Sequence, residues 1–241
     1  MKSKKTILIG VILLSTLILT SFRGQFNDDD EIVGVETVVI GEQEWTAKNL
    51  NVDVFRNGDP IPQIQDIIEW DKAMAKNQPA WCYLKDEVGN KYGKLYNIFA
   101  VIDPRGLAPE GFHVSTDEDW TVLTDFLGGL EVAGKKLKSP EGWWTETGFA
   151  DYPGLTLPQG RQNWIEGGFA DNSSGFGALG GAMYSRTFTY TYYDGRHGAW
   201  WTSTVKKKTQ YWYRSMSYSL VTVNRESSSY GDAMSVRCVK D

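Results

Sequence analysis

The side chains that most often carry acid–base, nucleophilic or metal chemistry are scarce in this sequence of 241 residues. Its histidines are His113 and His197, and its cysteines are Cys82 and Cys238. The two histidines are far apart in the sequence and neither lies beside a pair of cysteines, so they cannot supply the three protein ligands of a catalytic zinc site. We therefore expect structural imidazoles, no bound metal and no cofactor, and the sequence favours a role other than catalysis.

Cys82 and Cys238 can form just one intramolecular disulfide if the protein reaches an oxidising compartment. In the chain-entropy model such a bridge would stabilise the folded state by about 5 kcal/mol, because it closes a long loop. Two buried free thiols explain the same residues. Both alternatives remain open at the level of sequence.

Motifs of catalytic loops are absent or incomplete. Residues 175–181, GFGALGG, match the spacing G-x-G-x-x-G, but DNSS precedes them where a dinucleotide-binding loop requires a buried strand. No G-x-S-x-G nucleophile elbow occurs in the sequence. A polysaccharide-active enzyme would need carboxylates that converge in space, and the candidates are Glu146, Asp151 and Asp171.

Tryptophans are the main candidates for ligand binding. Residues 139–182 form a long region rich in Gly, Trp, Asn and Ser, and loops of such length are often functional. Flat indole rings stack on sugars or anchor protein partners. The candidates in and after this region are Trp143, Trp144, Trp164, Trp200 and Trp201. Core packing explains the same rings, and the adjacent Trp200 and Trp201 predict one ring inward and one outward on a strand.

A turn before that tryptophan pair adds two polar candidates. In the stretch YYDGRHGAWW, Asp194 and Arg196 lie on either side of a glycine. Both side chains are placed to line a ligand site, although turn chemistry alone also explains them.

His113 opens the stretch HVSTDEDW, whose three consecutive acids suggest a metal or catalytic cluster at first sight. The spacing of Ser115 or Thr116 from Glu118 or Asp119 is instead that of a capping box at a helix start. Acids in a first turn complement the positive end of the helix dipole. We therefore predict scaffold: a helix that ends at a Gly-Gly pair and has the apolar face Trp120, Leu123, Phe126 and Leu127.

The first 24 residues have the layout of an export signal, with three lysines followed by an apolar run. We expect a cleaved signal peptide or a membrane anchor over 1–24, an acidic linker over 25–36 and one domain over 37–241. The formal charge of −5 becomes more negative without the basic leader, so a nucleic-acid partner is excluded. The basic run VKKKTQ at 205–210 predicts a solvated hairpin end.

The pattern of elements predicts an α+β fold. Residues 36–50 predict two short strands that turn at Gly41 and Glu42, and Asp66 caps a short helix with Ile67, Ile68, Trp70 and Ala73 inward. PAWCYL predicts another strand. The runs GAWWTST, TQYWYRSMSY, LVTVNRES and SVRCVKD predict a closing antiparallel sheet.

Several of these stretches together resemble one family. IGEQEWTAKNLNV, FRNGDPIP, YGKLYNIFAV, RGLAPEGFHVSTDEDW, AGKKLKS and SVRCVKD are similar to the Fibrobacter succinogenes major paralogous domain, which is abundant in exported proteins of Bacteroidetes and Fibrobacteres. The resemblance covers about residues 37–241. It implies a C-type lectin-like fold with short antiparallel sheets, one or two main helices and a long Gly/Trp-rich loop, since HVSTDEDW and SVRCV also resemble formylglycine-generating enzymes.

The resemblance does not extend to known activities of related folds. Formylglycine-type catalysis needs a close pair of reactive cysteines, and of the two here only Cys238 matches a family motif, in the terminal strand. The Glu-Pro-Asn, Gln-Pro-Asp and Trp-Asn-Asp triplets of calcium-dependent lectins are missing. Ser115 stands where the family commonly has Pro, which makes the entry to the helix less rigid but keeps the cap. Ala108 stands where many members have Cys, which puts a disulfide that is usual in the family in doubt.

These observations predict an exported binding or adhesion module of the cell envelope. Its ligand would be a surface glycan or a protein, bound by the long loop and the edge formed by Trp200 and Trp201. The alternatives are a polysaccharide-active enzyme with an unrecognised site and a purely structural surface protein.

Overall fold

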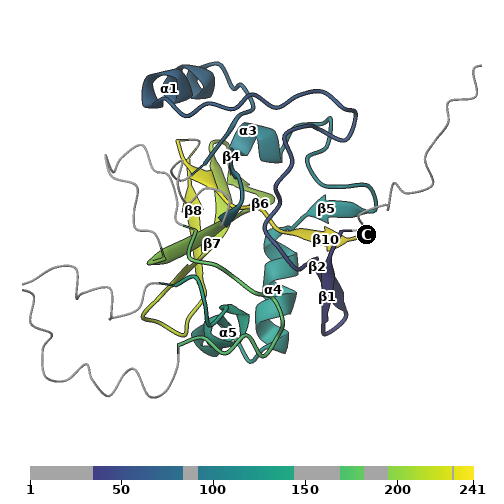
Figure 1. Cartoon of the computed structure of the whole chain (residues 1–241), viewed down its shortest axis with the longest axis vertical. Helices are drawn as coiled ribbons and strands as arrows, with labels where there is room; N and C mark the ends of the chain where they lie inside the picture. Colours follow the sequence, from purple (N-terminus) through teal and green to yellow (C-terminus); the bar gives the residue numbers. More distant parts are fainter. Residues whose placement is uncertain (1–34, 84–91, 144–168, 182–194, 230) are drawn as a thin grey trace, which may run out of the picture. The chain divides into compact units, whose positions relative to one another are not determined.

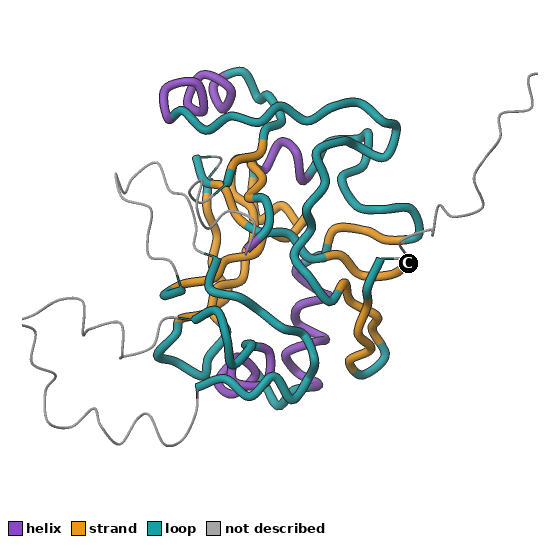
Figure 2. The backbone as a smooth tube through the Cα atoms, in the orientation of Figure 1, coloured by secondary structure: helices purple, strands orange, loops and turns teal. Residues whose placement is uncertain are grey.

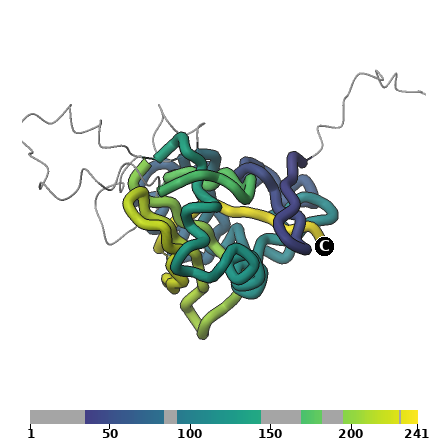
Figure 3. Tube along the Cα trace, turned by 90° about the horizontal axis from the view of Figure 1, so that it is seen from below, coloured from purple at the N-terminus to yellow at the C-terminus, as the bar shows by residue number. Residues whose placement is uncertain are grey.

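Strands from the two ends of the domain pair in one sheet of the computed structural model, which describes residues 35–83, 92–143, 169–181, 195–229 and 231–241. Its four antiparallel strands lie in the order β1-β2-β10-β5. They are β1 (Thr37–Ile40), β2 (Gln43–Thr46), β10 (Cys238–Lys240) and β5 (Phe112–Val114). Figure 3 shows the yellow C-terminal strand beside the purple N-terminal hairpin, so the first and last family motifs are neighbours in space.

Two antiparallel sheets of three strands each complete the strand inventory of the described residues (Figure 2). One has the order β3-β4-β9, with β3 (Trp81–Cys82), β4 (Leu95–Asn97) and β9 (Ala233–Met234). The other has the order β6-β7-β8, with β6 (His197–Lys207), β7 (Gln210–Ser217) and β8 (Asn224–Ser228). The predicted antiparallel pairing near the C-terminus is present, but β9 and β10 belong to other sheets.

Helix α4 (Asp117–Phe126) begins and ends where the sequence predicts. Thr116 is the N-cap and forms a capping box with Asp119, and the three acids of HVSTDEDW lie in the first turn of the helix, as predicted. Trp120, Leu123 and Leu127 are buried, whereas Phe126 is 64% exposed. The other helices in the described residues are α1 (Ile67–Ala75), α3 (Ile98–Val101) and α5 (Leu130–Leu137).

Helix α1 departs from its prediction in its first turn. Asp66 caps it as expected, accepting hydrogen bonds from the amides of Ile68 and Glu69. Trp70 and Ala73 face the core, but Ile67 and Ile68 are 44% and 63% exposed. The expected inward position of both isoleucines is wrong, because the contact with the domain involves only the stripe through Trp70, Ala73 and Met74.

Short antiparallel sheets together with a few helices make this an α+β domain, as predicted. Its unit begins at Val35, and the expected leader lies outside the described residues. Within the described part, no helix has the length and hydrophobicity that a membrane span requires.

Candidate functional site

Trp200 and Trp201 are both core residues, each with 0% exposure. Their side chains leave β6 on opposite faces. Trp200 packs in the cluster of Trp45, Trp120 and Phe176, and Trp201 packs in a second cluster with Trp81 and Tyr96. The expectation of one outward ring is therefore wrong: β6 carries packed side chains on both faces at this point, and neither indole offers a face to solvent.

Trp143 is half-buried and packs against the cluster that contains Trp200. Its Nε1 donates to the carbonyl of Ala178 at 2.8 Å, and its ring lies 5.3 Å from the ammonium of Lys138. Lys138 is buried and donates to two carbonyl oxygens, and this burial lowers its pKa to about 8. Trp143 thus contributes to core packing.

Only some of the other predicted ligand residues lie in the described part of the chain. Trp144, Trp164 and Asp194 lie outside the described residues. Arg196 is half-buried just before β6, where its carbonyl accepts from the amide of Tyr218 at 2.9 Å. Of the carboxylates named for a hydrolase, Asp171 accepts from the amide of Ser173 at 2.9 Å, and Glu146 and Asp151 lie outside the described residues.

Cys82 and Cys238 are buried free thiols. They belong to different sheets and to different core clusters. Burial raises the pKa of each thiol to about 12, so neither is a thiolate at neutral pH. Of the two alternatives from sequence, the structure has the unbonded one.

His113 is held between two carboxylates. Its Nδ1 lies 2.8 Å from Asp241 Oδ1, and its Nε2 lies 3.1 Å from Asp119 Oδ2. Burial would lower the pKa of His113, but the two hydrogen bonds and charges outweigh burial and raise it above its ordinary value. The imidazole ties β5 to α4 and to the last residue, as a structural group does. Within the described residues, no cluster of three or more His, Cys, Asp or Glu could hold a metal ion.

A hollow of about 320 Å³ lies where the family motifs meet, and we call it the motif hollow. Such a volume is at the lower end of the usual range for small-molecule sites. The segments that line it come from four parts of the chain: Ala47, Lys48, Asn49 and Asn51 after β2, Tyr92 and Gly93 before β4, Gly177 and Leu179 in the long region, and Arg237 before β10. Within the described part of the long region, the residues that line the hollow are Gly177 and Leu179, whereas Trp143 lies outside its lining.

Asn49 joins the walls of the motif hollow. Its Oδ1 accepts from Trp200 Nε1 and Arg237 Nε, both at 2.9 Å. Its Nδ2 donates to the carbonyl of Tyr92 at 2.9 Å and to Ser235 Oγ at 3.1 Å. Four hydrogen bonds saturate the amide and fix it in one orientation. The site is therefore built on a side chain that cannot move without breaking bonds to three other segments.

Arg237 places a buried positive charge behind Asn49. The residue is 1% exposed, and Nη1 and Nη2 donate to the carbonyls of Thr46 at 2.6 Å and Gly177 at 3.2 Å. Its guanidinium carbon lies 4.4 Å from the centre of the Phe176 ring. These partners are neutral, and burial lowers the pKa of Arg237, yet a guanidinium remains charged at neutral pH. The field in the motif hollow favours oxygen-rich ligands.

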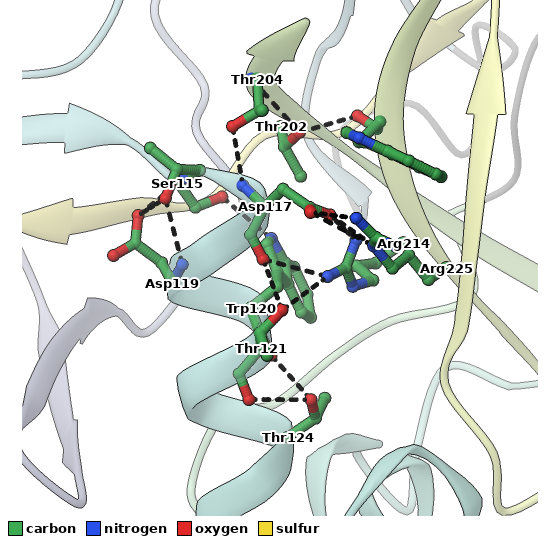
Figure 4. A network of polar contacts seen from close by, with 12 residues as sticks. Ser115, Asp117, Asp119, Trp120, Thr121, Thr124, Thr202, Thr204, Arg214 and Arg225 are labelled. Carbon is green, nitrogen blue, oxygen red and sulfur yellow. Dashed lines mark hydrogen bonds and ion pairs between the residues drawn. The ribbon is translucent and has the colours of Figure 1, made fainter. Parts of the chain in front are cut away.

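A second polar network lies at the start of α4 (Figure 4). The carboxylate of Asp117 is bound by Arg214 and by Arg225, whose Nη2 lies 2.7 Å from Asp117 Oδ2. Arg214 also donates from Nη2 to the carbonyl of Asp117 at 3.0 Å, and its side chain is fully buried. Burial would raise the pKa of Asp117, but the two guanidinium groups lower it. One carboxylate thereby links α4 to β7 and β8.

Sequence reasoning missed Asn49 and Arg237. The available signal was a charged residue inside the apolar strand motif SVRCV and an amide inside WTAKNLNV. A charge in a buried strand requires partners. Which residues provide them depends on pairing between the two ends of the chain, and that pairing is tertiary.

The family comparison agrees with the motifs that meet at this site. The model of the Fibrobacter succinogenes major domain matches residues 38–240, which confirms the resemblance found in the sequence. No curated protein and no solved structure gives a match.

Proposed function

We propose that this chain, which belongs to the Fibrobacter succinogenes major domain family, is a binding or adhesion module of the cell envelope and that its ligand occupies the motif hollow. The apolar leader over 1–24 supports export, either through a signal peptide or through a membrane anchor. Because Trp200 and Trp201 are buried, they cannot form the ligand surface expected from the sequence. The proposed surface is instead the lining of the motif hollow.

The observation that carries the proposal is the motif hollow itself. Several polar groups converge on it, and Asn49 and Arg237 behind them are held by six hydrogen bonds in all. Preorganised walls reduce the entropy lost when a ligand binds. Lys48 and Asn51 lie at the rim with exposed side chains, so they can bind a ligand without loss of core packing.

The chemistry of these groups favours a glycan. Sugars present many hydroxyl groups, whose oxygens accept from ammonium and amide N–H groups and whose O–H groups donate to carbonyl oxygens. A neutral sugar also needs no carboxylate in the site. We therefore propose the end or a single unit of a surface glycan as the ligand class.

The fold proposal is a C-type lectin-like domain. Its support is the pairing of β5 with β10, which brings the motif pieces HVSTDEDW and SVRCV together with Cys238 opposite Val114. The Gly/Trp-rich region contributes Gly177 and Leu179 to the hollow, in keeping with a ligand loop.

The test is a titration of the purified protein with soluble oligosaccharides and cell-wall fragments, followed by calorimetry. Asn51→Ala and Lys48→Ala should each weaken binding about fivefold, because each removes hydrogen-bonding groups worth about 1 kcal/mol. The matched controls are Asn224→Ala and Lys76→Ala, which make the same changes at exposed positions elsewhere.

Unchanged affinity in folded Asn51→Ala and Lys48→Ala variants would remove the motif hollow as the binding site. Release of new reducing ends during the titration would convert the proposal from a binder to a polysaccharide-active enzyme. Self-association without any response to sugars would instead support the structural role.

A further inference from the structure

An exposed cation–aromatic cluster lies at the free end of the β6-β7-β8 sheet. The half-buried ring of Trp212 has the guanidinium carbon of Arg225 3.8 Å and the ammonium of Lys206 4.4 Å from its centre. Lys206 comes from β6, Trp212 from β7 and Arg225 from β8, and Lys206 reaches across to Ser227 Oγ at 2.9 Å. We call Lys206, Trp212 and Arg225 the Trp212 cluster.

Arg225 connects the Trp212 cluster to the network in Figure 4. Arg225 donates from Nε and Nη2 to the carboxylate of Asp117, which Arg214 also binds. Two of its three guanidinium nitrogens are therefore fixed, and Nη1 has no partner within the described part of the chain. The side chain remains 42% exposed, so a ligand can reach it.

The charges around the Trp212 cluster do not balance. Arg214 and Arg225 share the single carboxylate of Asp117, which is itself only 13% exposed, and Lys206 donates to the neutral hydroxyl of Ser227. Glu226 follows Arg225 on β8, so its side chain leaves the opposite face of the sheet, where it accepts from Ser215 Oγ at 2.6 Å. Lys207 and Lys208 are exposed at the hairpin end. A positive surface thus remains on a protein of net negative charge.

We infer that the Trp212 cluster is a second binding site, which takes an acidic polysaccharide. Cations held over an aromatic ring lose less side-chain entropy when an anion binds than free lysines do. A strip of separate cations suits a chain of spaced carboxylate or sulfate groups. The negative charge of the whole domain disfavours the denser phosphate chain of a nucleic acid.

Polygalacturonate, with neutral galactan as the uncharged counterpart, tests the inference by calorimetry at low ionic strength. Lys206→Gln should weaken polygalacturonate binding about threefold to fivefold, and Trp212→Leu by a similar factor, because each removes an exposed charge or its support. Lys76→Gln is the matched control, since it removes the same charge from an exposed position on the C-cap of α1. Thermal unfolding of each variant checks that the domain remains folded.

The site would be supported if the protein binds polygalacturonate but not galactan and if added salt abolishes this binding. Lys206→Gln should also weaken it, whereas Lys76→Gln should not. Equal weakening by both lysine variants would overturn it in favour of long-range charge attraction. Tighter binding of polyphosphate or single-stranded DNA than of polygalacturonate would also overturn it. The site is independent of the motif hollow: Asn51→Ala should leave polygalacturonate binding unchanged, so either proposal can fail without the other.

Discussion

The environments of Trp200 and Trp201 on strand β6 are opposite to that of Trp212 on the neighbouring strand β7. The first two are fully buried, whereas Trp212 is half-buried and holds two cations. Near its start, β6 lies between two packed clusters, and the hairpin then extends beyond them to an exposed turn after Lys207. The same residue type is core or surface according to what packs on each face of the sheet.

The largest expected effect is a difference in folding stability between variants of the buried and the half-buried tryptophans. Trp201→Ala should lower the free energy of unfolding by about 3–5 kcal/mol, because it leaves a cavity in a closely packed cluster. Trp212→Ala should cost about 1 kcal/mol or less, since the ring is partly solvated. Denaturation in urea measures both, and a similar loss in the two variants would contradict the comparison.

The next effect concerns the anchor between the core and the Trp212 cluster. Asp117→Asn should destabilise the domain by about 3 kcal/mol, because it leaves the buried Arg214 without its counterion. Asp125→Asn, at an exposed position of the same helix, is the control and should change stability little. The contribution of Asp117 is present above the ordinary pKa of an Asp side chain and is lost as the pH falls through its lowered pKa.

Asn49→Ala should have an intermediate effect of about 2 kcal/mol on the free energy of unfolding, because its partners Arg237 and Trp200 lose their acceptor. Asn49→Asp keeps the acceptor but loses both donors, and should recover part of the loss. Chemical denaturation of the pair checks this, and no difference between the two variants would show that Oδ1 is not the stabilising atom.

The smallest effect is a contrast in pH dependence between the two histidines. Because its folded pKa is raised, His113 stabilises the fold below its unfolded pKa of about 6.5, and this contribution is lost as the pH rises through the folded pKa. His113→Gln should therefore lower the melting temperature more at about pH 5.5 than at about pH 8.5.

His197 should respond with the opposite sign. Burial, with a smaller contribution from Arg196, lowers its pKa despite Glu226, so protonation in acid costs stability. The His197→Gln variant should therefore become more stable relative to the unsubstituted protein as the pH falls. Differential scanning at both pH values measures the two variants, and a parallel response would show that the environments of the histidines are alike.

Local signals explain which parts of the fold could be predicted. Helix α4 is marked by Thr116, by its acids and by a Gly-Gly stop, all within a dozen or so residues. Ile67 and Ile68 carry the same kind of apolar signal, but the core contacts only the other side of α1. Periodicity reports that a side chain is apolar, whereas burial depends on which surface packs against it.

The sequence by itself determined the family, the α+β character, the capped helix and the structural use of His113, because these depend on motifs or on neighbours a few residues apart. Only the tertiary structure decided that Trp200 and Trp201 are both buried, that the cysteines are unbonded and that Asn49 meets Arg237. Those outcomes depend on pairing between segments separated by more than a hundred residues, as Asn49 and Arg237 are. The sequence shows that a buried polar group needs a hydrogen-bond partner and that an apolar side chain needs burial, but it does not show which distant residue provides either.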